Sequence, residues 1–490
     1  MSAATHDVAG RRWAGLAVIA AAQFMVIMDT SIIGVALPRM QSDLGFDQGN
    51  LSWVFNAYVI ALGGLLLLGG RLSDLFGARR IFSAGWVVLI IGSVLAGAAS
   101  SVPVELLGRA VQGAGSALIA PSALTLLMTL FGSRPSELPK AFALYGAAAP
   151  AGGTAGVFLG GVITEYASWP WVFYVNIPVA LVILGLTPRL MPAGALANGS
   201  RRVDVLGAGL ATAGLATAVF AIVEAPEVGW GAARTWALLV VAAALLSGFV
   251  AVQRRRREPL VRLEILRTPN LAGANIAQFL LGGAWIPMWF FLNLYLQQVL
   301  GFSAFPSGSA LLPMTALIMI GMVVLAPRLM GRLGPKRTAV TGLLLLAAGM
   351  AWLAAVRPDG SYAVDVLPAS LVAALGMSLA FIPTLGLAIS SARPEEGGLA
   401  SGLVNTSYQL GSALGLAVMT AIAAAATAGA TPGADGVPAP EALTDGFSAA
   451  FVGAAVVAVL GGLAVARLIR TAPIGGAAAE SQAAEAASSH

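Results

Sequence analysis

Residues 69–85 read GGRLSDLFGARRIFSAG, and residues 326–342 read APRLMGRLGPKRTAVTG. The two stretches align at a constant offset of 257 residues with five identities, among them Gly77 with Gly334. Each stretch follows the second apolar run in a block of six such runs. Parallel repeats of this kind build many membrane transporters, with the substrate site at the interface between repeats. The sequence therefore predicts two related six-span halves.

The composition is that of a polytopic membrane protein. The chain has 490 residues, of which 58% are hydrophobic and 10% charged, and its mean hydropathy is +0.86. Soluble domains carry roughly 25% charged residues. A helix needs about 20 apolar residues to cross the hydrocarbon core, and such runs occupy nearly the whole chain. The first run continues from Trp13 to Pro38, which is too long for a cleaved signal peptide and predicts an uncleaved span.

Fourteen apolar runs are predicted to cross the membrane, so the expected fold class is all-α integral membrane. They lie near residues 13–37, 51–70, 81–100, 103–130, 141–165, 172–190, 205–225, 235–252, 271–298, 307–327, 338–356, 366–391, 398–425 and 447–467. We expect four parts: a six-helix bundle at 1–190, two linker helices at 191–269, a second six-helix bundle at 270–470 and a disordered tail at 471–490.

The basic residues predict the orientation. With both termini in the cytoplasm, 23 of the 27 Lys and Arg lie on the cytoplasmic side, and only Arg39, Arg234 and Arg357 lie outside. This asymmetry follows the positive-inside rule. The net charge of +5 is therefore a topology signal, and we expect the lipid bilayer, and no nucleic acid, as a partner.

Several chemistries lack the residues they need. The chain has no cysteine, and its two histidines, His6 and His490, lie at the chain ends. It also lacks the GxxxxGK[ST] phosphate loop of ATP-coupled proteins. The sequence predicts neither an enzyme nor a metal or cofactor site.

One acid interrupts the first span, FMVIMDTSIIGVALP at residues 24–38. A charge at the bilayer centre costs at least about 2.5 to 3.5 kcal/mol, so Asp29 needs a partner. Asp29 lies about 13 Å along a helix from Pro38, and Arg109 lies about 10 Å from Pro103. Both spans enter from the outer face, so we predict that the two charges pair at similar depth. The pair is either a static structural link or a proton-coupling site.

Amide and aromatic side chains within the spans are predicted to line a substrate cavity. Singly, each could equally satisfy a hydrogen bond between helices. As a set, with methionines nearby, they suit amphipathic organic molecules. The predicted cavity residues are Asn56, Gln112, Asn176, Gln278, Trp285, Asn293, Asn405 and Gln409.

The loop GGRLSDLFGARR resembles the signature loop of the major facilitator superfamily. Two other stretches, MDTSIIGVALP and ELLGRAVQGAGSALIAPSA, resemble the first-span and fourth-span motifs of its fourteen-span drug:proton antiporter branch. The resemblance implies the major facilitator fold, with Asp29 and Arg109 in proton coupling. It also implies a conformational gating loop formed by Gly70, Asp74, Gly77, Arg79 and Arg80.

The stretch GGTAGVFLGG at 152–161 departs from that branch. Val157 stands where drug exporters of the superfamily usually carry a proline that is thought to mark antiporters. The glycines at 152, 156 and 160 still recur once per turn, which predicts a smooth helix face for close packing. The direction of transport is therefore open at this point.

The expected function is proton-coupled efflux of drugs, dyes or antibiotics across the cytoplasmic membrane, by alternating access of a monomer. We expect the proton-motive force to be the energy source, and we expect no cofactor. Three alternatives stay open. They are a dedicated exporter of one endogenous metabolite, an importer or facilitator, and a membrane scaffold or sensor without transport.

Overall fold

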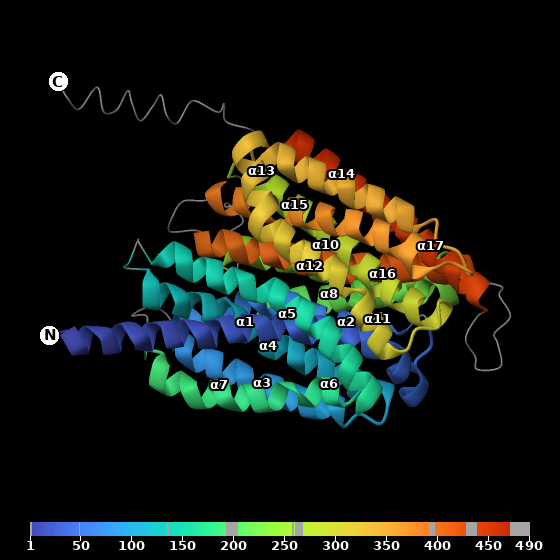
Figure 1. Cartoon of the computed structure of the whole chain (residues 1–490). Coiled ribbons are helices and arrows are strands. Elements are labelled where there is room, and N and C mark those ends of the chain that lie inside the picture. Colours follow the sequence, from blue (N-terminus) through green and yellow to red (C-terminus); the bar gives the residue numbers. More distant parts are fainter. Residues whose placement is uncertain are drawn as a thin grey trace, which may run out of the picture.

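The computed structural model is helical throughout the residues it describes, which are 2–48, 50–132, 134, 137–192, 204–256, 259, 268–391, 397–427 and 439–470. The helix axes lie roughly parallel to one another, and the connecting loops lie at two opposite ends of the bundle (Figure 1). The predicted tail at 471–490 lies outside the described residues.

The N-terminal part is built from three closely packed helix pairs: α3 on α4, α1 on α5 and α2 on α4. Two shorter helices, α6 and α7, together form the sixth apolar stretch, which packs against α3. The helices are α1 (Ser2–Leu44), α2 (Trp53–Phe76), α3 (Ala78–Gly97), α4 (Val102–Phe131), α5 (Leu138–Tyr166), α6 (Trp171–Tyr174) and α7 (Asn176–Leu190).

Two linker helices follow, α8 (Val205–Val228) and α9 (Ala233–Arg255). Helix α8 packs against α2 of the first part and α16 of the last, whereas only 11% of the apolar window of α9 is buried. Asp204 ties the pair together, because its carboxylate accepts hydrogen bonds from Gly207 N at 2.8 Å and Gln253 Nε2 at 2.6 Å. The linker pair therefore presents α9 to the surroundings.

The C-terminal part repeats the packing of the first, with α14 on α15 and α10 on α16 and α17. Three π-helical turns, η2 to η4, interrupt its helices. The elements are α10 (Leu271–Leu294), η2 (Tyr295–Val299), α11 (Ala304–Ala310), α12 (Leu312–Ile320), η3 (Gly321–Leu325), α13 (Ala326–Leu333), α14 (Pro335–Leu353), η4 (Tyr362–Val366), α15 (Leu367–Ser391), α16 (Gly397–Thr427) and α17 (Pro440–Leu468).

Glycines at the repeat offset make equivalent helix contacts in the two parts. A β-carbon added to Gly85 of α3 would lie 2.9 Å from the carbonyl oxygen of Gly115 on α4. A β-carbon added to Gly342 of α14 would lie 2.8 Å from the carbonyl oxygen of Gly376 on α15. Only glycine permits such close helix packing. Gly85 and Gly342, which the sequence repeat aligns, thus make similar close contacts in the two parts.

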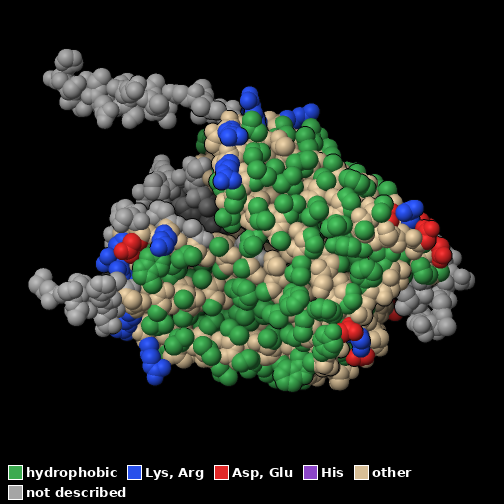
Figure 2. Space-filling view, in the orientation of Figure 1, with side chains coloured by type: hydrophobic (Ala, Val, Ile, Leu, Met, Phe, Trp, Pro, Cys, Tyr) green, Lys and Arg blue, Asp and Glu red, His purple; other side chains and the backbone are tan. Residues whose placement is uncertain are grey.

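Twelve helical stretches in the described part of the chain are long and apolar enough to cross a membrane. Helix α2, with 24 residues, and α14, with 19, lie outside these twelve, although each packs against helices of its own part. Figure 2 shows hydrophobic side chains over most of the visible face, with Lys and Arg gathered toward the end that carries the N-terminus. The chain is a multi-pass membrane protein.

The two parts are joined at the end where α1 finishes. Gln48 Nε2 donates to Gln298 Oε1 at 3.0 Å, and Gln298 Nε2 donates to Gln41 Oε1 at 2.9 Å. The neighbouring Gln297 donates from Nε2 to the carbonyl oxygen of Val35 at 3.2 Å. This amide network links α1 and its following loop to η2, at the end that the sequence predicts to be outside.

Candidate functional site

Asp29 lies on α1 with no solvent exposure, and three side chains donate hydrogen bonds to its carboxylate. Arg109 Nη1 donates to Oδ2 at 3.0 Å, while Gln112 Nε2 and Asn176 Nδ2 donate to Oδ1 at 3.1 and 2.6 Å. The pairing of Asp29 with Arg109 predicted from their depths is therefore confirmed.

Arg109 is equally buried and has further partners. Its Nη1 donates to Gln112 Oε1 at 2.7 Å and its Nε to the carbonyl oxygen of Val54 at 3.1 Å. The guanidinium carbon lies 4.5 Å from the ring centroid of Tyr58 and 5.8 Å from that of Phe173. A buried charge is tolerated only with good pairing and hydrogen bonds, and aromatic faces add to the attraction.

Ser93 of α3 completes the network. Its hydroxyl accepts from Gln112 Nε2 at 2.9 Å and from Asn176 Nδ2 at 3.4 Å. The close approach of α3 to α4 depends on glycine, because a β-carbon on Gly92 would lie 2.9 Å from the carbonyl oxygen of Gly108. Side chains of α4 and α7 thus bind the Asp29 carboxylate of α1, and Ser93 of α3 binds two of these donors.

The glycine face predicted on α5 is confirmed. Gly152, Gly156 and Gly160 all lie against the backbone of α1. A β-carbon on Gly156 would lie 2.7 Å from the carbonyl oxygen of Met28, and one on Gly160 would lie 2.6 Å from that of Ile32. Helix α5 therefore covers the turn of α1 that carries Asp29.

Val157, which replaces the usual proline, is buried between the two parts. Its carbonyl oxygen faces α11, where a β-carbon added to Gly308 would lie 2.6 Å away. The departure from the antiporter pattern thus falls at a contact between the N-terminal and C-terminal parts.

The predicted gating loop lies at the junction of α2 and α3. It contains half-buried Gly70, Asp74, buried Gly77, half-buried Arg79 and exposed Arg80. Gly77 has φ of 89° and its repeat partner Gly334 has φ of 79°, values that glycine adopts readily. Arg79 Nη1 donates to the carbonyl oxygen of Met191 at 3.3 Å. The side chain of Asp74 lies outside the described residues.

The eight predicted cavity residues fall in different places. Gln112 and Asn176 contact Asp29, as described above. Asn56 is buried, and no other described residue is a hydrogen-bond partner for its side-chain amide. Asn405 is exposed. These four residues thus lie in three settings: two in the Asp29 network, one buried and one exposed.

The remaining four belong to the C-terminal part. Gln278 of α10 donates to Thr384 Oγ1 of α15 at 2.9 Å. Asn293 donates to the carbonyl oxygen of Trp289, and a β-carbon added to Gly34 of α1 would lie 3.2 Å from Asn293 Nδ2. Trp285 is buried, and half-buried Gln409 would contact a β-carbon on Gly63 at 3.1 Å.

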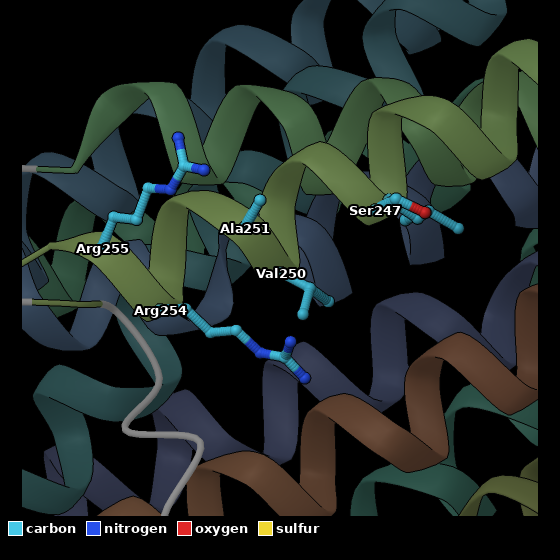
Figure 3. Close-up of a pocket in the computed structure, with 6 residues that line it drawn as sticks. Ser247, Val250, Ala251, Arg254 and Arg255 are labelled. Carbon is cyan, nitrogen blue, oxygen red and sulfur yellow. The ribbon is translucent and has the colours of Figure 1, made fainter.

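A surface cavity of about 530 Å³ lies along α9, away from the Asp29 network (Figure 3). It is lined by Leu246, Ser247, Val250, Ala251, Arg254 and Arg255. Figure 3 shows Arg254 and Arg255 pointing to different sides of the last turn of α9. In the described ranges, no group of three or more acidic, histidine or cysteine side chains is placed to hold a metal ion.

Sequence reasoning missed Glu105. This residue lies in the first turn of α4 with no solvent exposure, and neither carboxylate oxygen has a hydrogen-bond partner among the described residues. A signal was available, because Glu105 precedes Arg109 by four residues and so shares its helix face. An acid in the first turn of a helix commonly complements the helix dipole, so the sequence alone gives no reason to assign Glu105 to a functional site.

A bundle of apolar helices with a charged pair buried between them is typical of polytopic membrane transporters, and we assign the chain to this class. The chain belongs to the Major Facilitator Superfamily, whose sequence profile matches residues 19–416.

The chain is similar to proteins that are named for antibiotic resistance or export. A puromycin resistance protein of Streptomyces alboniger is 40% identical, over 84% of this chain and 82% of the relative. A cephamycin export protein of Amycolatopsis lactamdurans is 37% identical, over 80% of this chain and 81% of the relative. The fold is similar to that of the human organic anion transporter MFSD10, with a TM-score of 0.61 at 16% identity, over 93% of this chain and 99% of that one.

Proposed function

We propose that this chain exports amphipathic small molecules across the cytoplasmic membrane and that protons drive the export. The observation that carries the proposal is the buried Asp29 carboxylate, held by Arg109, Gln112 and Asn176. Family membership and relatives named for antibiotic resistance and export support the outward direction. The proton-motive force would be the energy source, with the monomer as the working unit.

The proposed topology has fourteen spans with both termini in the cytoplasm. Support comes from α2 and α14, each of which packs within its own part, in addition to the twelve apolar stretches. The distribution of Lys and Arg supports the same orientation. Two linker helices, rather than one, keep the two six-helix halves in the same orientation.

Proton coupling would act through the donors around Asp29. An ionised carboxylate attracts the Arg109 guanidinium strongly, whereas a protonated carboxyl group does not. Proton binding to Asp29 would therefore weaken the ties among α1, α4 and α7 and favour a different arrangement of these helices. One charge crossing 100 mV contributes about 2.3 kcal/mol, enough for a substrate gradient of more than tenfold.

A second candidate is a dedicated exporter of one metabolite made by the same cell. The relative named for cephamycin export favours this function, because its name specifies a single class of compound. A narrow resistance profile, together with biosynthetic genes beside the gene for this chain, would separate a dedicated exporter from a multidrug pump.

The test is transport of a fluorescent lipophilic cation into inverted membrane vesicles, with and without an uncoupler. We expect uncoupler-sensitive accumulation by the wild type and its loss in Asp29→Asn. Asp47→Asn removes an exposed carboxylate and should transport normally. Unchanged uncoupler-sensitive transport by Asp29→Asn would rule out Asp29 as the proton-coupling residue.

A further inference from the structure

Glu105 is the one buried carboxylate near Asp29 that the network described above does not use. Its side chain is on α4, one helical turn before Arg109 on the same face and nearer the predicted outer end. It is fully buried, and both oxygens lack hydrogen-bond partners in the described part of the structure. On Arg109, Nη2 likewise lacks a partner there, although Nη1 and Nε are bonded.

These facts indicate a neutral Glu105 in this arrangement. An ionised carboxylate that is buried without a partner is very costly, and such a group takes up a proton instead. Asp29, by contrast, has the charged donor that an anion needs. Arg109, the one fully buried cation among the described residues, is thus paired with Asp29, while the carboxyl group of Glu105 lies one helical turn from Arg109.

The charged groups acting on Glu105 come from two helices. They are Arg109 on its own helix and Asp29 on α1. From α2, the Tyr58 hydroxyl donates to Ser116 Oγ at 2.8 Å. The charged residues of α3, Arg79 and Arg80, lie at the opposite end of that helix from the turn that meets the start of α4.

We propose that Glu105 is a second proton-binding carboxyl group of the coupling site, which loads Asp29, and that Arg109 pairs with whichever of the two carboxylates is ionised. This inference rests on the proposed proton-coupled function. In the loading step, the O–H bond of Glu105 breaks and its proton bonds to an Asp29 oxygen. Glu105 becomes the carboxylate and Arg109 Nη2 donates to it, so the site keeps one positive and one negative charge. Asp29 then releases its proton toward the cytoplasm and pairs again with Arg109, and a proton from the outer side reloads Glu105.

The experiment compares Glu105→Gln, Glu105→Asp and wild type in inverted vesicles, using the same lipophilic cation over a range of pH values. The glutamine variant keeps the shape of a neutral carboxyl group but cannot release a proton. We expect pH-gradient-driven transport to fall by at least about tenfold with a flattened pH profile, as when a positioned proton donor is removed. Glu105→Asp should restore the pH dependence in part.

The control is Glu441→Gln, which changes an exposed acid in the first turn of α17. It should match the wild type. Binding of the cation to purified Glu105→Gln, measured by fluorescence, should stay within about twofold of wild type because no hydrogen bond is lost. Bound substrate together with a lost pH response separates a proton-loading role from a folding defect.

The outcomes distinguish this inference from the proposed function. Wild-type transport that is insensitive to the uncoupler would contradict the proposed function itself. Uncoupler-sensitive wild-type transport with an unchanged pH profile in Glu105→Gln would overturn only the role of Glu105. Equal defects in Glu105→Asp and Glu105→Gln would also overturn it, because side-chain shape rather than proton exchange would then matter.

Discussion

The two repeats join their equivalent helices with different chemistry. In the N-terminal part, α1 is tied to α4 by the charged pair of Asp29 and Arg109 at 3.0 Å. In the C-terminal part, α10 is tied to α15 by Gln278, which donates to Thr384 Oγ1 at 2.9 Å and to the carbonyl oxygen of Phe381 at 3.2 Å. The first link is a buried ion pair, whereas the second joins neutral groups.

The comparison distinguishes the contacts that stabilise the fold from the charged pair that we propose for proton coupling. The glycine contacts of α3 with α4 recur between α14 and α15 at the repeat offset, so close packing is common to both parts. The buried ion pair belongs to one part alone among the described residues. We infer that the C-terminal part supplies a matching scaffold, while the N-terminal part carries the proton.

The largest expected effect on stability comes from breaking the ion pair. Arg109→Gln leaves Asp29 as a buried anion without its cation, which typically costs about 3 to 5 kcal/mol. The thermal unfolding temperature of the variant in detergent should be many degrees lower than that of the wild type at neutral pH. Arg357→Gln is the control, because Arg357 is mostly exposed, and an ion pair with an exposed partner contributes far less than a buried one. Equal losses in the two variants would contradict the account.

A bulky residue on the glycine face of α5 should disturb the same site through packing. Gly156→Leu would force α5 away from Met28 and the Asp29 turn, and overpacking of this kind costs about 1 to 3 kcal/mol. We expect reduced transport and a lower unfolding temperature. Gly146→Leu on the same helix has open space around the added side chain and should behave as wild type. A tolerant Gly156→Leu would show that this packing is dispensable.

One substitution made in both halves sharpens the comparison directly. Gln112→Leu removes a donor to Asp29, so it should shift the pH profile of transport and cost about 1.5 to 3 kcal/mol, as hydrogen bonds to charged groups do. Gln278→Leu removes a neutral link, so it should cost about 1 kcal/mol and leave the pH profile unchanged. A changed pH profile of transport in Gln278→Leu would indicate that both parts contain a group whose protonation affects transport.

The smallest effect is expected at the amide network that joins the parts. Gln298→Ala removes the donor to Gln41 and the acceptor for Gln48, a loss of about 0.5 to 1.5 kcal/mol per hydrogen bond. Because these bonds exist only while the predicted outer ends are together, the variant should favour their separation. Faster labelling of a cysteine introduced at Ala304, which is buried at the start of α11 and faces α5, would report that shift. Ser42→Ala, which removes a hydroxyl bonded within α1, is the control.

The sequence predicted the site best where regular helix geometry decides position. The depth of Asp29 and Arg109 follows from counting residues along helices, so their pairing could be predicted. The glycine face of α5 follows in the same way from a spacing of four. Each predicted apolar run also coincides with helical residues in the structure, within a few residues at most ends.

The orientation of each helix about its own axis could not be predicted. It depends on tertiary packing, so the sequence could not show that Gln112 and Asn176 donate hydrogen bonds to Asp29. The same ambiguity hid Glu105, whose burial becomes visible only once α4 is packed against its neighbours. Asn405 was assigned to the cavity by residue type alone, and it is exposed.

The central claim is that protons move through the N-terminal part by way of Asp29. Its most direct test is substrate-dependent proton flux in liposomes containing the purified protein and a trapped pH-sensitive dye. We predict that adding the lipophilic cation drives proton movement through the wild type and through Gln278→Leu, but not through Asp29→Asn. Proton flux that persists in Asp29→Asn would contradict the account.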